Sequence, residues 1–174
     1  TQRHAFAQSV VIRAVLAGDG IGPEFTQQAL RVLRLIEQKR DVVFACDEVE
    51  FGAAAYFSTG KAFPDATKKA CDEADAILKG PIGLSHEESE KIPVEERPER
   101  GALLPMRRRL NTYANFRPIS LPKGMAHFSP LKPEIVSEGI DIMLIRELIG
   151  GLYFGGKERG ETEEGLRYVK ESLD

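Results

Sequence analysis

A strand, a glycine-rich turn and the start of a helix follow one another in the segment Val10-Val11-Ile12-Arg13-Ala14-Val15-Leu16-Ala17-Gly18-Asp19-Gly20-Ile21-Gly22-Pro23-Glu24. Its first seven residues are mostly β-branched or apolar, which predicts a buried strand. Three glycines in five residues then predict a tight turn. Pro23 suits a first helical position and Glu24 suits the positive end of a helix dipole, so we expect a helix to run on to about Gln38.

Further strands and helices alternate downstream of this segment. Residues 42–49 and 74–79 have the composition of strands, and residues 53–58 and 65–73 that of helices. The resulting β-α-β-α-β order predicts an α/β fold, a layered sheet with flanking helices.

The second half of the chain changes character. Residues 85–100 are acidic and interrupted by prolines, which predicts a solvated loop or lid. We expect a helix over 102–110, an extended segment over 113–121 and an apolar strand over 140–149. The charged stretch 157–174 carries no clear pattern.

Composition excludes several classes of protein. The 24 basic and 27 acidic side chains leave a net charge of −3 without a basic stripe, so nucleic acid is not expected as the main partner. No run approaches the roughly 18 apolar residues of a membrane helix. Cys46 and Cys71 lack the spacing of metal or redox sites and fit a reducing cytoplasm. His4, His86 and His127 share no ligand spacing, so we predict no metal site from them.

The glycine turn admits two interpretations. Bare backbone can approach a bound phosphate closely, but Gly18-x-Gly20-x-Gly22 is not the dinucleotide fingerprint Gly-x-Gly-x-x-Gly. A nucleotide loop and a plain tight turn both remain open.

Arginines are the clearest candidates for an anion-binding site. Arg146 lies inside an apolar strand, where it either pairs with Asp141 or Glu147 or presents its planar fork to a carboxylate. Arg117 raises the same question. Residues 107–109 are three consecutive arginines that fan around one helix, so only one or two of them can face a ligand.

Five stretches in order carry a resemblance to a known family: AGDGIGPE (17–24), RPERGALLPMR (97–107), YANFRP (113–118), SPLK (129–132) and IRELIGGLYFG (145–155). The chain resembles the isocitrate/isopropylmalate dehydrogenase family of β-decarboxylating dehydrogenases, and within it the branch that acts on 3-isopropylmalate. The resemblance implies a two-domain α/β enzyme of that fold, truncated here, with an incomplete cofactor-side domain at 1–112 and the beginning of a dimerisation and substrate domain at 113–174.

The resemblance also implies an activity and its site. The enzyme would oxidise 3-isopropylmalate with NAD and decarboxylate it to 4-methyl-2-oxopentanoate, in leucine biosynthesis, as a cytoplasmic homodimer that uses Mg²⁺ or Mn²⁺. The matching positions imply a carboxylate clamp of Arg107, Arg117 and Arg146, a proton-donating Tyr153, a Glu99 that bridges substrate and nicotinamide, an apolar wall of Leu103 and Leu104, and cofactor contacts at Ile21, Gly80, Pro81, Ile82 and Gly83.

Three departures from the family leave alternatives open. Ile149 stands where threonine is usual, residues 79–83 (Lys-Gly-Pro-Ile-Gly) lean towards isocitrate-type relatives, and family members are about twice as long. We expect the metal ligands and the lysine base in a further part of a longer subunit. The alternatives are an enzyme of tartrate, D-malate or isocitrate, and a non-catalytic half-subunit that only binds.

Overall fold

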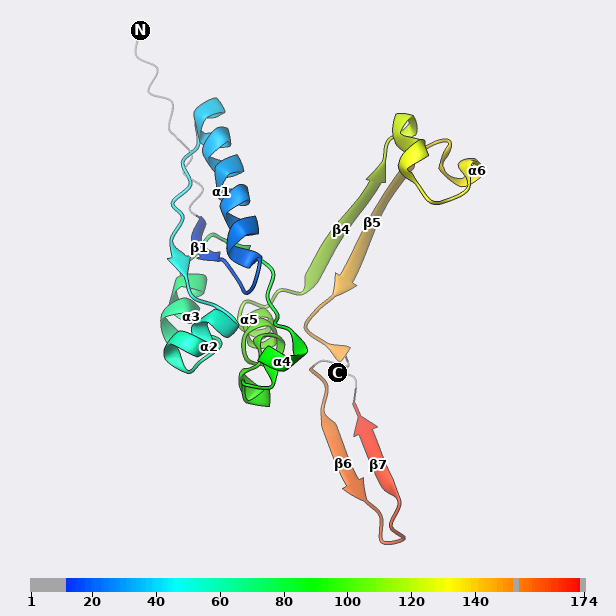
Figure 1. The fold of residues 1–174 in the computed structure, drawn as a ribbon. Helices are drawn as coiled ribbons and strands as arrows, with labels where there is room; N and C mark the ends of the chain where they lie inside the picture. The colour runs from blue at the N-terminus through cyan, green and yellow to red at the C-terminus, as the bar shows by residue number, and fades with distance from the viewer. Residues whose placement is uncertain (1–11, 152–153, 173–174) are drawn as a thin grey trace. The chain divides into compact units, whose positions relative to one another are not determined.

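The computed structural model describes residues 12–151 and 154–172 (Figure 1). The chain divides into two compact units, Thr1–Leu110 and Asn111–Asp174. Among the described residues, the first unit holds a parallel sheet of three strands, and the second holds two antiparallel strand pairs. The expectation of an α/β fold, a layered sheet with flanking helices, is confirmed, and the structure adds that this sheet is parallel.

The sheet of the first unit has β1 (Ile12–Leu16) at its centre. β2 (Glu48–Val49) and β3 (Ala76–Lys79) pair with β1 on either side, both in parallel. Leu16 at the end of β1 faces both Val49 and Lys79 in the register. Because the strands run in one direction, the turns that follow them emerge at the same edge, which is where open α/β sheets carry their ligand sites.

The core of this unit lies between the sheet and the helices α3 (Asp65–Asp72) and α5 (Leu104–Arg109). The rings of Phe51 and Phe63 meet edge to face in it, with centroids 5.4 Å apart. The buried members of the core come from strands, loops and helices and are Ala14, Leu16, Phe51, Ala62, Phe63, Cys71, Ala102 and Met106.

Helix α1 (Gly22–Lys39) begins where Pro23 predicts and ends within a residue of the predicted end. Only Gly22 and Thr26 of this helix are buried. Its apolar stripe, which includes Val32, is therefore largely open to solvent in the described part of the chain.

The second strand is much shorter than predicted. Residues 42–47 are not strand, and only Glu48–Val49 pair with β1. The amide of Phe44 donates instead to Oε1 of Glu37 on α1, at 2.6 Å. This segment is thus held by a helix side chain instead of a strand ladder, although its β-branched composition favours a strand.

Helices α2 (Ala53–Thr59) and α3 agree with the prediction to within one residue at each end. The expected loop over residues 85–100 is wrong in part. It contains α4 (His86–Ser89), a 3₁₀ turn η1 (Val94–Glu96) and the start of a π-helical turn η2 (Pro98–Leu103) that leads into α5. A capping box between Ser85 and Glu88 starts α4, and its Ser-x-x-Glu spacing is visible in the sequence.

The second unit contains an antiparallel ribbon of β4 (Ala114–Leu121) and β5 (Ile140–Glu147). Between these strands lie the 3₁₀ turn η3 (Lys123–Phe128) and the short helix α6 (Pro133–Val136). Pro118 sits within β4, which has β5 as its one neighbour among the described residues, and a proline is tolerated in a strand with an open edge.

A second hairpin follows where the sequence carried no clear pattern. β6 (Lys157–Glu161) pairs with β7 (Arg167–Glu171) in antiparallel register. Gly165 lies in the turn at a φ of +79°, which glycine adopts without strain. Strand β5 ends at Glu147, two residues before its predicted end, because the Glu147 carboxylate accepts bonds from the amides of Ile149 and Gly150 at 2.6 and 2.8 Å.

Candidate functional site

The glycines of the turn after β1 are explained largely by backbone packing. A Cβ on Gly18 would lie 1.9 Å from the carbonyl oxygen of Pro81, and one on Gly22 would lie 2.4 Å from that of Ala17. Gly18 also has a φ of +85°. Gly20 alone of the three has open space where a side chain would stand. The tight-turn interpretation therefore accounts for two of the glycines, and Gly20 leaves bare backbone at the surface.

Asp19 at the tip of β1 ties this turn to two other segments. Asp19 as a residue is 6% exposed. Its carboxylate accepts a bond from the amide of Ala54 at 3.0 Å through Oδ1 and one from the amide of Gly83 at 3.1 Å through Oδ2. Its own amide donates to the carbonyl of Pro81 at 3.0 Å. Sequence reasoning named Asp19 only as part of a motif. The signal was an acid between two glycines directly after a buried strand.

The predicted cofactor residues Gly80, Pro81, Ile82 and Gly83 follow β3 and lie against the glycine turn. Gly80 is buried, and a Cβ on it would lie 2.1 Å from the carbonyl oxygen of Ala17. Pro81 is exposed, whereas Ile82 and Gly83 are half-buried. This loop and the turn therefore form one interlocked edge.

Two more predicted residues lie at or beside this edge. Ile21, in the glycine turn, exposes 56% of its surface. Glu99 lies beside the loop, because its Oε1 would be 3.3 Å from a Cβ placed on Gly83. An exposed apolar side chain next to the bare backbone of Gly20 fits a flat ring or a ribose, so these residues are compatible with a dinucleotide.

Lys79 brings a further charge to the same edge. Its Nζ donates to the carbonyl of Gly80 at 2.7 Å. Burial lowers the pKa of the Lys79 ammonium, the positive charge of Arg107 lowers it further, and the negative charge of Asp19 opposes both effects. Lys79, Arg107 and Asp19 thus lie within electrostatic reach of one another.

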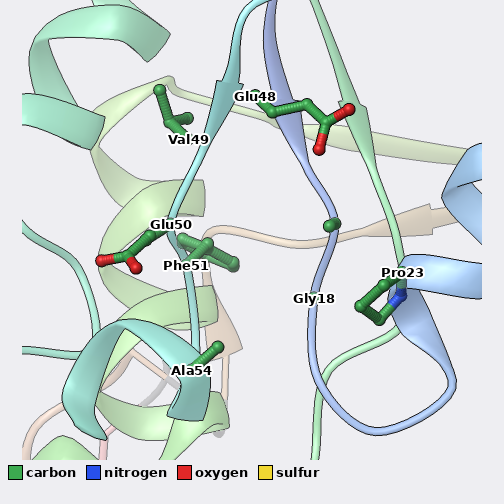
Figure 2. Close-up of a pocket in the computed structure, with 8 residues that line it drawn as sticks. Gly18, Pro23, Glu48, Val49, Glu50, Phe51 and Ala54 are labelled. Atoms are coloured by element: carbon green, nitrogen blue, oxygen red, sulfur yellow. The ribbon is translucent and has the colours of Figure 1, made fainter. Parts of the chain in front are cut away.

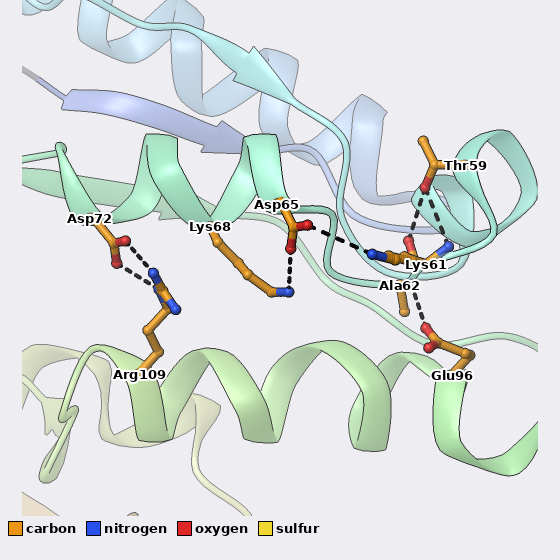
Figure 3. Close-up of polar contacts among 8 residues, drawn as sticks. All are labelled: Thr59, Lys61, Ala62, Asp65, Lys68, Asp72, Glu96 and Arg109. Atoms are coloured by element: carbon orange, nitrogen blue, oxygen red, sulfur yellow. Dashed lines mark hydrogen bonds and ion pairs between the residues drawn. The ribbon is translucent and has the colours of Figure 1, made fainter.

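The three consecutive arginines of α5 differ in burial and in their contacts. Arg109 is exposed and binds Asp72 of α3 with two bonds, Nε to Oδ1 at 2.7 Å and Nη2 to Oδ2 at 2.5 Å (Figure 3). Arg108 is exposed, and Arg107 is half-buried. Because successive residues are about 100° apart around a helix, an Arg109 that faces α3 turns Arg107 away from α3.

The predicted apolar wall lies at the junction of η2 and α5. Leu103 packs against the core, and both Leu103 and Leu104 are half-buried. Each leucine therefore keeps part of its surface free.

The two arginines of the second unit share one face of the β4–β5 ribbon. Arg146 lies opposite Asn115, and Nε of Arg117 donates to Oδ1 of Asn115 at 2.9 Å. Directly opposed residues share a face, as do residues two apart on one strand. Arg117 and Arg146 are diagonal neighbours in this register, a relation that places Cα atoms about 7–8 Å apart.

Asp141 and Glu147 lie on the other face of β5 from Arg146, because they are odd numbers of residues away along the strand. Tyr153, the predicted proton donor, falls outside the described residues.

A cavity of about 210 Å³ lies between the glycine turn with the start of α1 and the segment that runs from β2 to the start of α2 (Figure 2). Gly18, Pro23 and Phe51 line it together with the carboxylate-bearing Glu48 and Glu50. Acidic side chains disfavour a phosphate there, and the residues lining this cavity include none of the predicted site residues.

Within residues 12–151 and 154–172, no group of three or more His, Cys, Asp and Glu side chains could hold a metal ion. None of the helices in that part of the chain is long and apolar enough to cross a membrane. The described residues thus offer no fit for the divalent cation that the family resemblance implies.

Comparison with known proteins gives a consistent answer. The family model for isocitrate/isopropylmalate dehydrogenase matches residues 12–172. The 3-isopropylmalate dehydrogenase of Campylobacter jejuni is 44% identical over 148 residues, which are 85% of this chain and 41% of that protein. The 3-isopropylmalate dehydrogenase of Syntrophotalea carbinolica is 46% identical over 154 residues, 88% of this chain and 42% of that protein.

Solved structures agree with the sequence relatives. An isocitrate dehydrogenase from Methylococcus capsulatus superposes with a TM-score of 0.68 at 25% identity, covering 94% of this chain and 42% of that one. A β-decarboxylating dehydrogenase from Thermococcus kodakarensis gives 0.59 at 25% identity, with coverages of 94% and 40%. The chain spans about two fifths of the length of the curated relatives it matches. Since the family model matches nearly every described residue, the chain belongs to the isocitrate/isopropylmalate dehydrogenase family.

Proposed function

We propose that this chain supplies part of an NAD-dependent enzyme that oxidises and decarboxylates 3-isopropylmalate, acting as a cytoplasmic homodimer in leucine biosynthesis. The observation that carries the proposal is the placement of Arg117 and Arg146 on one face of the β4–β5 ribbon. Two guanidinium groups on one face fit the two carboxylates of a small diacid, because each planar fork can bind one carboxylate with two bonds. The names of the relatives in Campylobacter and Syntrophotalea support this substrate.

The reaction has two bond-breaking stages. A hydride leaves the carbinol carbon for the nicotinamide of NAD, which is the chemistry that this cofactor supplies when bound, and the hydroxyl proton goes to a base. The bond to the carboxylate then breaks, carbon dioxide leaves, and its electron pair passes into an enolate. The enolate carbon takes up a proton to give 4-methyl-2-oxopentanoate.

Each predicted residue has a separate role in this scheme. The three arginines Arg107, Arg117 and Arg146 hold and orient the carboxylates, and Glu99 bridges the substrate and the nicotinamide from its place beside Gly83. Leu103 and Leu104 form the apolar wall for the isopropyl group. Tyr153 delivers the proton to the enolate carbon. Ile21 in the glycine turn and the loop residues Gly80, Pro81, Ile82 and Gly83 would hold the cofactor.

The divalent cation of this family, Mg²⁺ or Mn²⁺, has no candidate cluster of ligands among the described residues. We therefore assign it no step here, and we propose that its ligands lie in a further part of the subunit.

A second substrate class is favoured by Lys79. The pKa of its ammonium is lowered in part by the charge of Arg107, so a second cation lies close to the first arginine of the clamp. A substrate with a third carboxylate, such as isocitrate, would neutralise both cations.

A turnover comparison decides between these functions. The purified protein that carries this chain is given NAD and, in turn, 3-isopropylmalate, D-malate, tartrate and isocitrate, and NADH formation is followed by absorbance. We expect the highest kcat/KM with 3-isopropylmalate. A higher kcat/KM with isocitrate would show that the enzyme belongs to the second substrate class. If the protein at full subunit length turned over none of these acids, the chain would be part of a non-catalytic binding module.

A further inference from the structure

We propose that Asp19 is a positioning residue: its buried carboxylate sets the conformation of the loop Gly80–Gly83 and thereby the affinity of the enzyme for NAD. This inference rests on the proposed function, and it concerns a residue that contacts neither substrate nor cofactor in that proposal.

The carboxylate of Asp19 is the point where three segments meet. Oδ1 accepts a bond from Ala54 in the first turn of α2, and Oδ2 accepts one from Gly83 after β3. The backbone of Asp19 adds two more bonds, donating to the carbonyl of Pro81 at 3.0 Å and accepting from the amide of Gly22 at 2.8 Å. One side chain therefore fixes the spacing between the glycine turn, α2 and the cofactor loop.

The contact with Gly83 links Asp19 to the proposed chemistry. Gly83 has a φ of +130°, a conformation that side-chain-bearing residues rarely adopt. The bond from its amide to Asp19 holds the loop in this conformation, and the other side of Gly83 lies next to Oε1 of Glu99. Moving Gly83 therefore changes both the surface offered to the dinucleotide and the space beside Glu99.

The chemistry of the site explains why a carboxylate is needed there. An ionised aspartate offers two oxygens that only accept, which matches two backbone N–H donors. Asparagine has the same shape but offers one oxygen and an NH₂ group, which cannot accept from an N–H. Asp19→Asn therefore removes one of the two side-chain bonds without opening a cavity.

The residues around Asp19 leave little room for a different side chain at this position. A Cβ on Gly52 would lie 2.6 Å from Oδ2 of Asp19, so the carboxylate fills the space above the start of α2. Asp19→Ala would empty this space and leave the partly buried amides of Ala54 and Gly83 without their acceptor.

The test compares Asp19→Asn and Asp19→Ala with the wild-type protein at full subunit length. We expect the KM for NAD to rise about 10-fold in Asp19→Asn, in line with the loss of one bond to a charged acceptor. We expect kcat and the KM for the hydroxy acid to change less than the KM for NAD, because the arginines are untouched and only the space beside Glu99 is altered. Asp19→Ala should show a larger rise in the KM for NAD if it folds, and Asp19→Asn decides the matter if it does not.

Amide hydrogen exchange gives a second readout that does not need turnover. Exchange should accelerate at one of the amides of Gly83 and Ala54 in Asp19→Asn and at both in Asp19→Ala. The exposed Asp41→Asn serves as the matched control and should change neither exchange nor kinetics. A lower unfolding free energy with an unchanged KM for NAD would make Asp19 purely structural and overturn the inference. A wild-type protein without NAD-dependent turnover would instead overturn the proposed function itself.

Discussion

The guanidinium of Arg109 grips both carboxylate oxygens of Asp72, which joins α5 to α3 across the first unit (Figure 3). This pair sets the rotation of α5 about its axis. Since Arg107 lies two residues earlier, about 200° around the helix, it points away from α3. Among the three consecutive arginines, Arg109 therefore has a structural role, and Arg107 remains a candidate for substrate binding.

Arg107 and Arg109 should therefore respond differently to the same replacement. Arg107→Lys is expected to lower kcat/KM for the hydroxy acid by about 10–100-fold, because an ammonium cannot replace two bonds to one carboxylate. Arg109→Lys, the matched control, should leave kcat/KM nearly unchanged. Steady-state kinetics of both variants check this, and equal losses would remove Arg107 from the clamp.

The Asp72–Arg109 pair also predicts a dependence of stability on pH. The hydrogen bond from Arg109 holds the pKa of Asp72 below its ordinary value of 3.8. Its contribution is present above pH 3.8 and disappears as the pH falls through the lowered pKa in the folded protein. Asp72→Asn should therefore weaken the acid dependence of the unfolding free energy, measured with urea from pH 6 downwards. The exposed Asp75→Asn should follow the wild-type curve.

Lys79 predicts a second dependence of the unfolding free energy on pH, which comes from the burial of a charge and not from an ion pair. Burial lowers the pKa of its ammonium in the folded protein from 10.5, so the unfolded chain binds more protons between the lowered pKa and 10.5. The unfolding free energy should rise with pH in that window, and below it the cost of burying the charge is present in full. Lys79→Met should flatten this rise in urea titrations. An unchanged slope would mean that the ammonium is well hydrated.

Because the glycine turn packs closely against the loop Gly80–Gly83, adding one methyl group there should lower the unfolding free energy strongly. Gly18→Ala should lower the unfolding free energy by about 4 kcal/mol, because a Cβ would meet the carbonyl of Pro81 and φ is positive. Gly60→Ala has a similar φ, +80°, but open space around its Cβ, and should cost only about 1 kcal/mol. Chemical denaturation of both variants separates steric conflict from backbone strain.

Arg146 offers a test of the second half of the clamp. Arg146→Lys should lower kcat/KM about 10–100-fold by the same loss of a bidentate bond. Arg159→Lys on the exposed hairpin strand β6 is the control and should leave turnover unchanged. Full activity of Arg146→Lys would make this arginine a structural residue of the ribbon.

Local signals in the sequence account for much of the first unit. A β-branched run, closely spaced glycines and a proline at the start of a helix are features that a few neighbouring residues decide, so β1 and α1 could be predicted. The strand predicted over residues 42–47 is wrong. Their composition favours a strand, but the amide of Phe44 donates to a carboxylate of α1 instead of to a neighbouring strand. The hairpin of β6 and β7 has too few apolar residues to show a strand pattern.

The candidate site divides in the same way. Motifs alone named Arg117 and Arg146, but their common face depends on the register of two strands that lie far apart in the sequence. Asp19 was missed as a site residue because its carboxylate binds amides 35 and 64 residues away. Contacts over such separations leave no local pattern to read.

The β4–β5 ribbon has a consequence for how this chain behaves before it is fully assembled. Apolar side chains are exposed on both of its faces, with Phe116 64% exposed on one face and Ile142 52% exposed on the other, as in strands that other elements cover on both faces. During synthesis such a ribbon is an adhesive surface for other nascent chains. The β6–β7 hairpin that follows it carries many lysine, arginine and glutamate side chains. Charged side chains on exposed strands oppose the pairing of a strand of one copy with a strand of another.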